Sequence, residues 1–303
     1  MSQRNGTNPG INLSFCVKRW ITPGLWAPVV REQLGLDLIQ FSFDLVDPMW
    51  PASVLSRHAR EVRKAADDQG ITIHSAFIGL AHYTFNQLLH PDEEVRAFSE
   101  AWLERAYGFA AEAGIPGVGG PLGAIASRTD GTEANAIDER DYADLMERML
   151  RLGNKAKALG LSELYVEPTP MRREWPWTIE QARQMMTDVA GSATPWRLCV
   201  DWGHGTFQPL YGPQADTMEP WFTELHDVIG AVHIQQTDFQ FDRHWDFTEK
   251  GLVDPVEARA LLARTGLAQS PVFLEVFYPF ERDSISILEA LKASAASLKQ
   301  AFA

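Results

Sequence analysis

Short apolar runs alternate with longer helical patterns along the whole chain of 303 residues. The apolar runs are rich in β-branched and aromatic residues, which is typical of buried strands. They cover residues 11–17, 36–43, 71–77, 117–120, 163–167, 197–201, 231–235 and 272–276. Apolar positions at helical spacing predict helices over residues 23–33, 53–69, 92–113, 138–159, 178–189, 218–228, 255–264 and 284–303.

This alternation predicts an α/β protein. About eight strand–helix units in a chain of this length favour a single (β/α)₈ TIM barrel, with a doubly wound open sheet as the alternative. Gly70, Gly114 and Gly160 each stand between a helix and a strand, where a left-handed cap is expected. We expect residues 11–303 to form one domain, preceded by a loose polar segment over residues 1–10.

The charge and the cysteines narrow the class of protein. The formal net charge of -13 argues against a partner with a phosphate backbone and against an anionic membrane surface. Cys16 and Cys199 both lie in apolar, strand-like runs and are interpreted as core residues in a reducing compartment. Neither a secretory leader nor a membrane-spanning run is recognisable. We therefore expect a soluble cytoplasmic protein with no nucleic-acid or membrane partner, and association into a homo-oligomer is left open.

Four polar residues in the second half of the chain each close a short apolar run. They are Glu167, Asp201, His233 and Glu275. An unpaired charge is costly at the end of a buried strand, and three carboxylates at one end of a barrel would repel one another without a divalent cation between them. Together the four residues predict a metal site, although any one of them alone could equally be a salt-bridge partner.

The ligand set also indicates which metal it binds. Three carboxylates and one neutral imidazole favour one Mn²⁺ or Mg²⁺ ion, whereas Co²⁺ or Zn²⁺ could occupy the same site because intrinsic affinity rises toward the later metals. A ketose could bind such an ion through its carbonyl and an adjacent hydroxyl. The metal would then polarise the carbonyl and stabilise the enediolate that forms when the α-proton leaves.

Three local motifs carry a family resemblance. They are Val-Glu-Pro at Glu167, Asp-Trp-Gly-His at residues 201–204, and Leu-Glu-Val at Glu275. With these motifs the chain resembles the sugar isomerase/epimerase superfamily of xylose isomerase-like TIM barrels, which is also related to endonuclease IV. The resemblance implies that strands five to eight supply the four metal ligands, and that Glu167 and Glu275 are the two catalytic bases on opposite faces of the substrate.

The same resemblance suggests residues that meet the substrate. His204 corresponds to a substrate-facing histidine, and Asp242-Arg-His244 resembles the loop after strand seven. His74 corresponds to a histidine that binds extra zinc in the nuclease branch, and it could equally contact substrate or support the site.

Aromatic and basic residues near strand ends give further candidates for substrate binding. Trp50 could pack on the apolar face of a sugar, or it could only cover the barrel mouth. Lys18, Arg243 and His244 could bind a substrate phosphate, although basic residues in an acidic protein also neutralise nearby carboxylates.

The leading hypothesis is a metal-dependent epimerase or isomerase of a small ketose, free or phosphorylated. The N-terminal half is similar to the branch that acts on tetrulose phosphates such as erythrulose phosphate. Lyase chemistry on a carbonyl sugar is the main alternative, because it begins with the same proton abstraction. A DNA-repair nuclease is disfavoured by the acidic charge and by the absence of histidine from residues 117–123. A non-catalytic sugar-binding barrel would have no need for two opposed glutamates.

Overall fold

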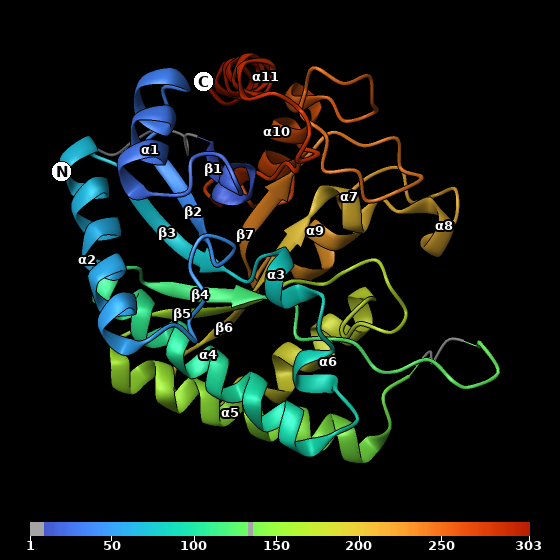
Figure 1. The fold of residues 1–303 in the computed structure, drawn as a ribbon. Coiled ribbons are helices and arrows are strands. Elements are labelled where there is room, and N and C mark those ends of the chain that lie inside the picture. Colours follow the sequence, from blue (N-terminus) through green and yellow to red (C-terminus); the bar gives the residue numbers. More distant parts are fainter. Residues whose placement is uncertain (1–8, 133–135) are drawn as a thin grey trace. The chain divides into compact units, whose positions relative to one another are not determined.

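The computed structural model describes residues 9–132 and 136–303. Within these residues, eight strands form a closed parallel barrel in chain order from β1 to β8 (Figure 1). Their bounds are β1 (Gly10–Asn12), β2 (Leu38–Ser42), β3 (Thr72–Phe77), β4 (Gly117–Gly120), β5 (Glu163–Val166), β6 (Trp196–Asp201), β7 (Ile229–Ile234) and β8 (Val272–Leu274). The predicted barrel is confirmed. The open-sheet alternative is wrong, because the first strand pairs in parallel with the last through Ile11 and Leu274.

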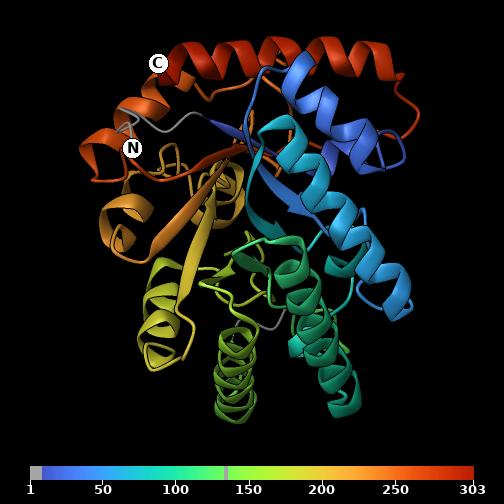
Figure 2. The same ribbon diagram turned by 90° about the vertical axis from the view of Figure 1, so that its left-hand side faces the viewer.

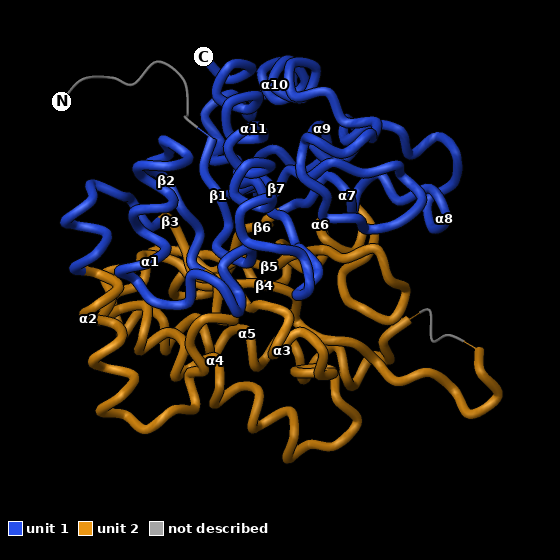
Figure 3. Tube along the Cα trace, turned by 45° about the horizontal axis from the view of Figure 1, so that its top comes forward, with its two compact units in different colours: residues 1–41, 64–73, 200–303 blue, residues 42–63, 74–199 orange. Residues whose placement is uncertain are grey.

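The chain divides into two compact units, coloured separately in Figure 3. Unit 1 comprises residues 1–41, 64–73 and 200–303, and unit 2 comprises residues 42–63 and 74–199. The prediction of one domain over residues 11–303 is not tested by this division and stays a prediction. The segment predicted to be loose lies outside the described residues up to residue 8, and Gly10 at its end already belongs to β1.

Unit 1 contains four consecutive parallel strands in the order β2-β1-β8-β7. Its helical segments are η1 (Leu13–Cys16), α1 (Pro23–Pro28), η2 (Val29–Gln33), α7 (Trp202–Gly205), α8 (Gln208–Tyr211), α9 (Glu219–Leu225), α10 (Pro255–Arg264) and α11 (Ser284–Phe302). The last two helices pack against each other, as the turned view of Figure 2 shows.

Unit 2 contains the parallel strands β3-β4-β5-β6, except for the first two residues of β3 and the last two of β6, which belong to unit 1. Its helical segments are α2 (Ala52–Gln69), which continues into unit 1, α3 (Leu80–Tyr83), η3 (Gln87–Leu89), α4 (Glu93–Ala113), α5 (Glu139–Leu159) and α6 (Ile179–Asp188). β4 is rich in glycine because Tyr165 of β5 packs directly across it. A Cβ on Gly119 would lie 2.3 Å from the Cβ of Tyr165. α4 and α5 lie side by side (Figures 1 and 2).

Most predicted elements are present within a few residues of their expected ends. The left-handed glycines are confirmed, with φ of 63° at Gly70, 75° at Gly114 and 85° at Gly160. The strand predicted over residues 11–17 is wrong after Asn12, because that side chain accepts from the backbone amide of Ser14 and begins a 3₁₀ turn. Cys16 therefore lies in a helical turn, although it is buried as expected. No helix among the described residues is long and apolar enough to cross a membrane.

A buried arginine joins the two long helices of unit 2. The side chain of Arg148 on α5 is 3% exposed and pairs with Glu100 at 2.7 Å, with Asp144 at 2.9 Å, and with Glu93. Arg151, one turn further along, also pairs with Glu100 but is half exposed. The two arginines therefore share a partner but differ in burial and in the number of carboxylates that they contact.

Replacing Arg148 with Met should destabilise the protein by about 3 kcal/mol, because the largely buried Glu100 and the partly buried Asp144 would lose their counter-charge. Arg151→Met should cost less than about 1 kcal/mol, since exposed ion pairs contribute little. Urea unfolding of the two variants provides the measurement. Equal losses would contradict the importance of burial at Arg148.

His82 is a buried titratable group in unit 2. Its ring stacks on Trp102 with centroids 4.0 Å apart and planes 3° from parallel. Burial lowers the pKa of His82 to about 4, although Asp47 acts in the opposite direction. Between this value and the ordinary 6.5, the unfolded chain binds a proton that the folded chain does not, so acid favours unfolding.

The contribution of His82 to the free energy of unfolding should therefore decrease as the pH falls from 6.5 toward 4. The full decrease amounts to about 3 kcal/mol. His82→Phe keeps an aromatic ring on Trp102 and should remove this part of the pH dependence. Denaturant unfolding of both proteins across the pH range measures it, and parallel pH profiles would show that His82 does not contribute.

Candidate metal centre

Three of the predicted metal ligands converge within unit 1. Asp201 is the last residue of β6, His233 lies near the end of β7, and Glu275 directly follows β8. Each offers a ligand atom, and these atoms lie within 4.8 Å of one another. All three residues are buried. Because the strands are parallel, their carboxyl ends bring together residues that are far apart in the sequence.

Asp201 has one satisfied and one unsatisfied oxygen. Its Oδ1 accepts from the backbone amide of His204 at 3.0 Å and from Nε2 of Gln235 at 2.7 Å. Its Oδ2 is buried and has no hydrogen-bond partner within the described part of the chain. A buried carboxylate oxygen without a partner is costly. A divalent cation at Oδ2 would remove this cost, and the neighbouring imidazole and carboxylate fit such an ion.

Two buried amides orient His233 and Glu275. The Oε1 of Gln40 lies 2.6 Å from both Nδ2 of Asn12 and Nε2 of His233. Because this oxygen only accepts, Nε2 of His233 carries a proton, and Nδ1 is the nitrogen that faces Glu275. Nδ1 is 2.9 Å from Oε2 of Glu275, whose Oε1 accepts from Asn12 at 3.0 Å. Burial raises the pKa of Glu275, but His233 and His244 outweigh it and lower the value.

The sequence analysis did not single out Asn12 and Gln40. A signal was present, because both are polar residues within runs predicted to be buried strands. Metal-binding histidines commonly donate their second N–H to such an acceptor, which fixes the ring and its tautomer.

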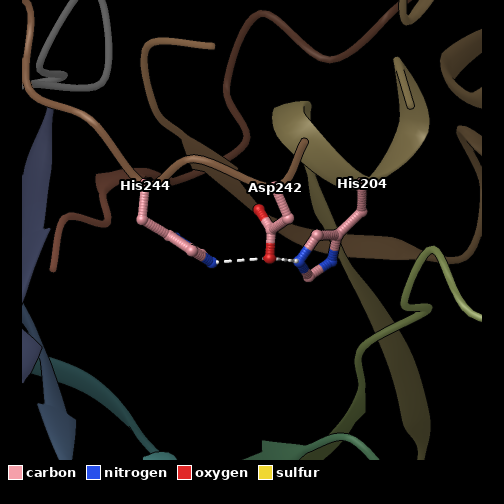
Figure 4. Close-up of side chains that lie close together, drawn as sticks. All are labelled: His204, Asp242 and His244. Atoms are coloured by element: carbon pink, nitrogen blue, oxygen red, sulfur yellow. Dashed lines mark hydrogen bonds and ion pairs between the residues drawn. The ribbon is translucent and has the colours of Figure 1, made fainter. Parts of the chain in front are cut away.

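A second group of side chains lies beside this one (Figure 4). Oδ2 of Asp242 accepts from Nε2 of His244 at 2.9 Å and from Nε2 of His204 at 3.1 Å. His204 lies on α7, whose first turn Asp201 caps, and the other two lie in the loop after β7. The predicted substrate-facing residues His204 and His244 are thus brought together by a carboxylate.

The pKa values of Asp201 and of the second group depend on one another. Burial raises the pKa of Asp201 to about 6, although His204 and His244 act in the opposite direction. Burial also opposes ionisation of Asp242, but His244 and His204 outweigh it and lower its pKa well below the usual range. Burial alone would lower the pKa of His244, but Asp242 and Glu275 outweigh burial and raise the pKa to about 9. At neutral pH, Asp242 and His244 therefore form a charged pair.

Glu167, the fourth predicted ligand, belongs to unit 2. It directly follows β5 and is buried, and its backbone amide donates to the carbonyl of Gly120. β5 pairs in parallel with β6 through Val166 and Leu198. Glu167 therefore lies at the carboxyl end of its strand, as the sequence predicts, and its part in the metal site stays a prediction.

Two further predicted substrate contacts also lie in unit 2. The ring of His74 packs on Tyr165, whose hydroxyl donates to Glu163 at 2.6 Å. Tyr165 and Glu163 both belong to β5, so His74 packs against this strand. Trp50 packs against His58, and its carbonyl accepts from Arg105. Binding of substrate by either residue stays a prediction.

The predicted phosphate-binding cations in unit 1 have aromatic neighbours. Nζ of Lys18 lies 4.3 Å from the ring centre of Phe280. The guanidinium of Arg243 pairs with Asp238 at 2.7 Å and stacks on Phe241. Arg243 thus has an acidic partner in its own loop, and its role toward a phosphate, like that of Lys18, stays a prediction.

Comparison with known proteins places this arrangement in a family. Residues 31–300 match the family described as xylose isomerase-like TIM barrel. The chain belongs to this family.

Named relatives and solved structures are similar to the chain over most of their length. D-erythrulose 1-phosphate 3-epimerase of Brucella abortus (strain 2308) is 23% identical over 286 residues, which cover 88% of this chain and 87% of the relative. A crystal structure from Rhodospirillum rubrum ATCC 11170, provisionally described as a xylose isomerase, is 39% identical with a TM-score of 0.91 and covers 97% of this chain and 99% of its own. D-psicose 3-epimerase from Clostridium cellulolyticum H10, solved with D-tagatose, is 15% identical with a TM-score of 0.72 over 97% and 99% of the two chains.

Mn²⁺ or Mg²⁺ should raise the melting temperature of the metal-free protein. At one hundred times its dissociation constant, a bound ion stabilises a protein by about 2.7 kcal/mol. Asp201→Asn keeps an oxygen to cap α7 but loses the carboxylate charge, so most of this stabilisation should disappear. Asp246→Asn is the control, because Oδ2 of the buried Asp246 also lacks a hydrogen bond among the described residues but lies 3.9 Å from Nη1 of Arg282. Equal metal responses in both variants would argue against a site at Asp201.

Proposed function

We propose that the chain is a divalent-metal-dependent epimerase of a small ketose or ketose phosphate. The observation that carries the proposal is the convergence of Asp201, His233 and Glu275, with one oxygen of Asp201 lacking a protein partner. Relatives named as sugar epimerases support the enzyme class. A tetrulose phosphate is the substrate we favour, in line with the name of the Brucella abortus relative.

Four side chains would bind the metal: Glu167, Asp201, His233 and Glu275. The pairing of β5 with β6 supports the inclusion of Glu167, because parallel neighbours end at the same edge of a sheet. The oxygen-rich set favours Mn²⁺ or Mg²⁺. When bound, the ion would supply positive charge that stabilises the substrate oxygens as the α-proton leaves.

Proton transfer is assigned to the two glutamates. One carboxylate takes the proton from the carbon beside the carbonyl, and the electron pair of that C–H bond moves toward the carbonyl oxygen to give an enediolate. The other glutamate, which starts as the carboxylic acid, gives its proton to the opposite face of the same carbon and inverts its configuration. Proton exchange with solvent then restores the starting forms of both glutamates. In unit 1, Asn12 donates to Oε1 of Glu275, and Oε2 lies 2.9 Å from Nδ1 of His233, so this base is oriented before substrate binds.

The second group would contact the substrate beside these bases. His204 and His244 are held in place by Asp242, and their imidazoles can hydrogen-bond sugar hydroxyls or a phosphate. Their rings lie nearly perpendicular, with centroids 5.9 Å apart. Two differently oriented donors suit a ligand with several hydroxyls.

Deuterium exchange followed by NMR tests the proposal. Protein loaded with Mg²⁺ is incubated in D₂O with three- to six-carbon ketoses, free and phosphorylated. We expect metal-dependent deuterium at the carbon beside the carbonyl, together with a new epimer. A positional isomer would indicate aldose–ketose isomerisation instead. Release of water or an aglycone would favour the lyase alternative, and absence of exchange from metal-loaded protein would overturn the proposal.

Glu275→Gln should reduce the exchange rate by a factor of about 10²–10⁴ at saturating metal, because an amide cannot accept the proton. Glu281→Gln is the control, since Glu281 is exposed in the loop after the same strand. The rates are measured with the substrate identified in the ketose panel. Full activity of Glu275→Gln would exclude Glu275 as a base.

A further inference from the structure

Gln235 connects the two groups of side chains in unit 1. It directly follows β7 and is fully buried. Its Nε2 lies 2.7 Å from Oδ1 of Asp201 and 2.8 Å from Oδ1 of Asp242, with Nδ1 of His244 at 3.3 Å. Its Oε1 accepts from the backbone amide of His244. One amide therefore contacts a candidate metal ligand and the carboxylate that both histidines share.

We propose that Gln235 is a positioning residue that sets the orientation of Asp201 and, through Asp242, of the His204 and His244 rings. This inference rests on the proposed function. Its consequence is that Gln235 keeps the metal-binding and substrate-binding side chains in one fixed geometry. The sequence analysis gave Gln235 no role.

The chemistry of an amide suits this position. An amide nitrogen has two hydrogens, and the two shortest contacts direct them at the two carboxylates. Donation to Oδ1 of Asp201 leaves the other oxygen of that carboxylate for a metal. A glutamate here would place a third negative charge between Asp201 and Asp242, whereas an apolar residue would leave both without this donor.

Two features of the backbone fit around Gln235. A Cβ on Gly203 would lie 2.6 Å from both Cδ and Nε2 of Gln235, so only glycine leaves room for the amide at the start of α7. His244 has φ of 46°, a left-handed conformation that is unfavourable for residues other than glycine. Its backbone N–H donates to Gln235, which helps to stabilise this conformation.

The neighbouring Gln236 provides a matched control. It is also buried, but among the described residues the hydrogen bonds of its amide are to the backbone of Thr237 and Val253. Its backbone forms a two-way bridge with Trp245 that closes the loop. Gln235→Met and Gln236→Met therefore remove the same functional group at adjacent buried positions, and only the first contacts the carboxylates.

The test uses the purified full chain without sugar. Imidazole signals are recorded by ¹H–¹⁵N NMR on metal-free protein, with His204→Gln and His244→Gln to assign them, and Mn²⁺ affinity is measured by calorimetry. Gln235→Met should shift both assigned signals and weaken Mn²⁺ binding by about 10–100-fold. Gln236→Met should leave both readouts unchanged, even where its melting temperature falls.

Unchanged imidazole signals and a Mn²⁺ affinity within about twofold of wild type in Gln235→Met would overturn the inference. Equal shifts in Gln236→Met would also overturn it, because they would indicate general loosening of the loop. If Gln235→Met does not fold, Gly203→Ala displaces the same amide and should give the same changes. Because neither readout needs a substrate, failure of the epimerase proposal would appear separately, as absence of exchange in the wild-type protein.

Discussion

The cost of burying two carboxylates beside an imidazole is the constraint on which the candidate site depends. Asp201 and Glu275 end or follow strands whose other residues are mostly apolar, so each oxygen needs a donor or a cation. In unit 1 the donors come from buried polar groups, namely Asn12, Gln235 and the backbone of His204. One oxygen of Asp201 is unmatched among the described residues, and that imbalance is what a divalent ion would correct.

The hydrogen bonds that satisfy the remaining oxygens also orient the side chains of the site. Gln40 accepts from Nε2 of His233, so the nitrogen that faces Glu275 is Nδ1. Gln235 donates to both Asp201 and Asp242 and so connects the metal ligand to the loop after β7. The polar network is therefore continuous from the strand ends to the loop after β7. Such networks are stable only when each member has its partners, which explains why amides recur at these buried positions.

The periodicity of the sequence was sufficient to predict the order of helices and strands. Hydrogen-bond geometry was needed to locate the residues at which they end. Apolar runs and left-handed glycines such as Gly114 identified strands and helices within a few residues. Residues 13–17 look like a continuation of a strand, but an apolar run has the same appearance in a buried turn. The side chain of Asn12 decides between them by capping the turn, and such a local contact has no periodic signal.

The sequence by itself determined the alternation of elements, and with it the barrel and the strand ends at which Asp201, His233 and Glu275 lie. Hydrophobic periodicity encodes this information, because burial along a strand or helix repeats at a fixed spacing. Only the tertiary structure decided which polar residues serve these ligands. Asn12 and Gln235 are separated by more than two hundred residues in the sequence, and the direction of each amide follows from strand register and loop closure. Those depend on contacts between distant segments, which no local pattern records.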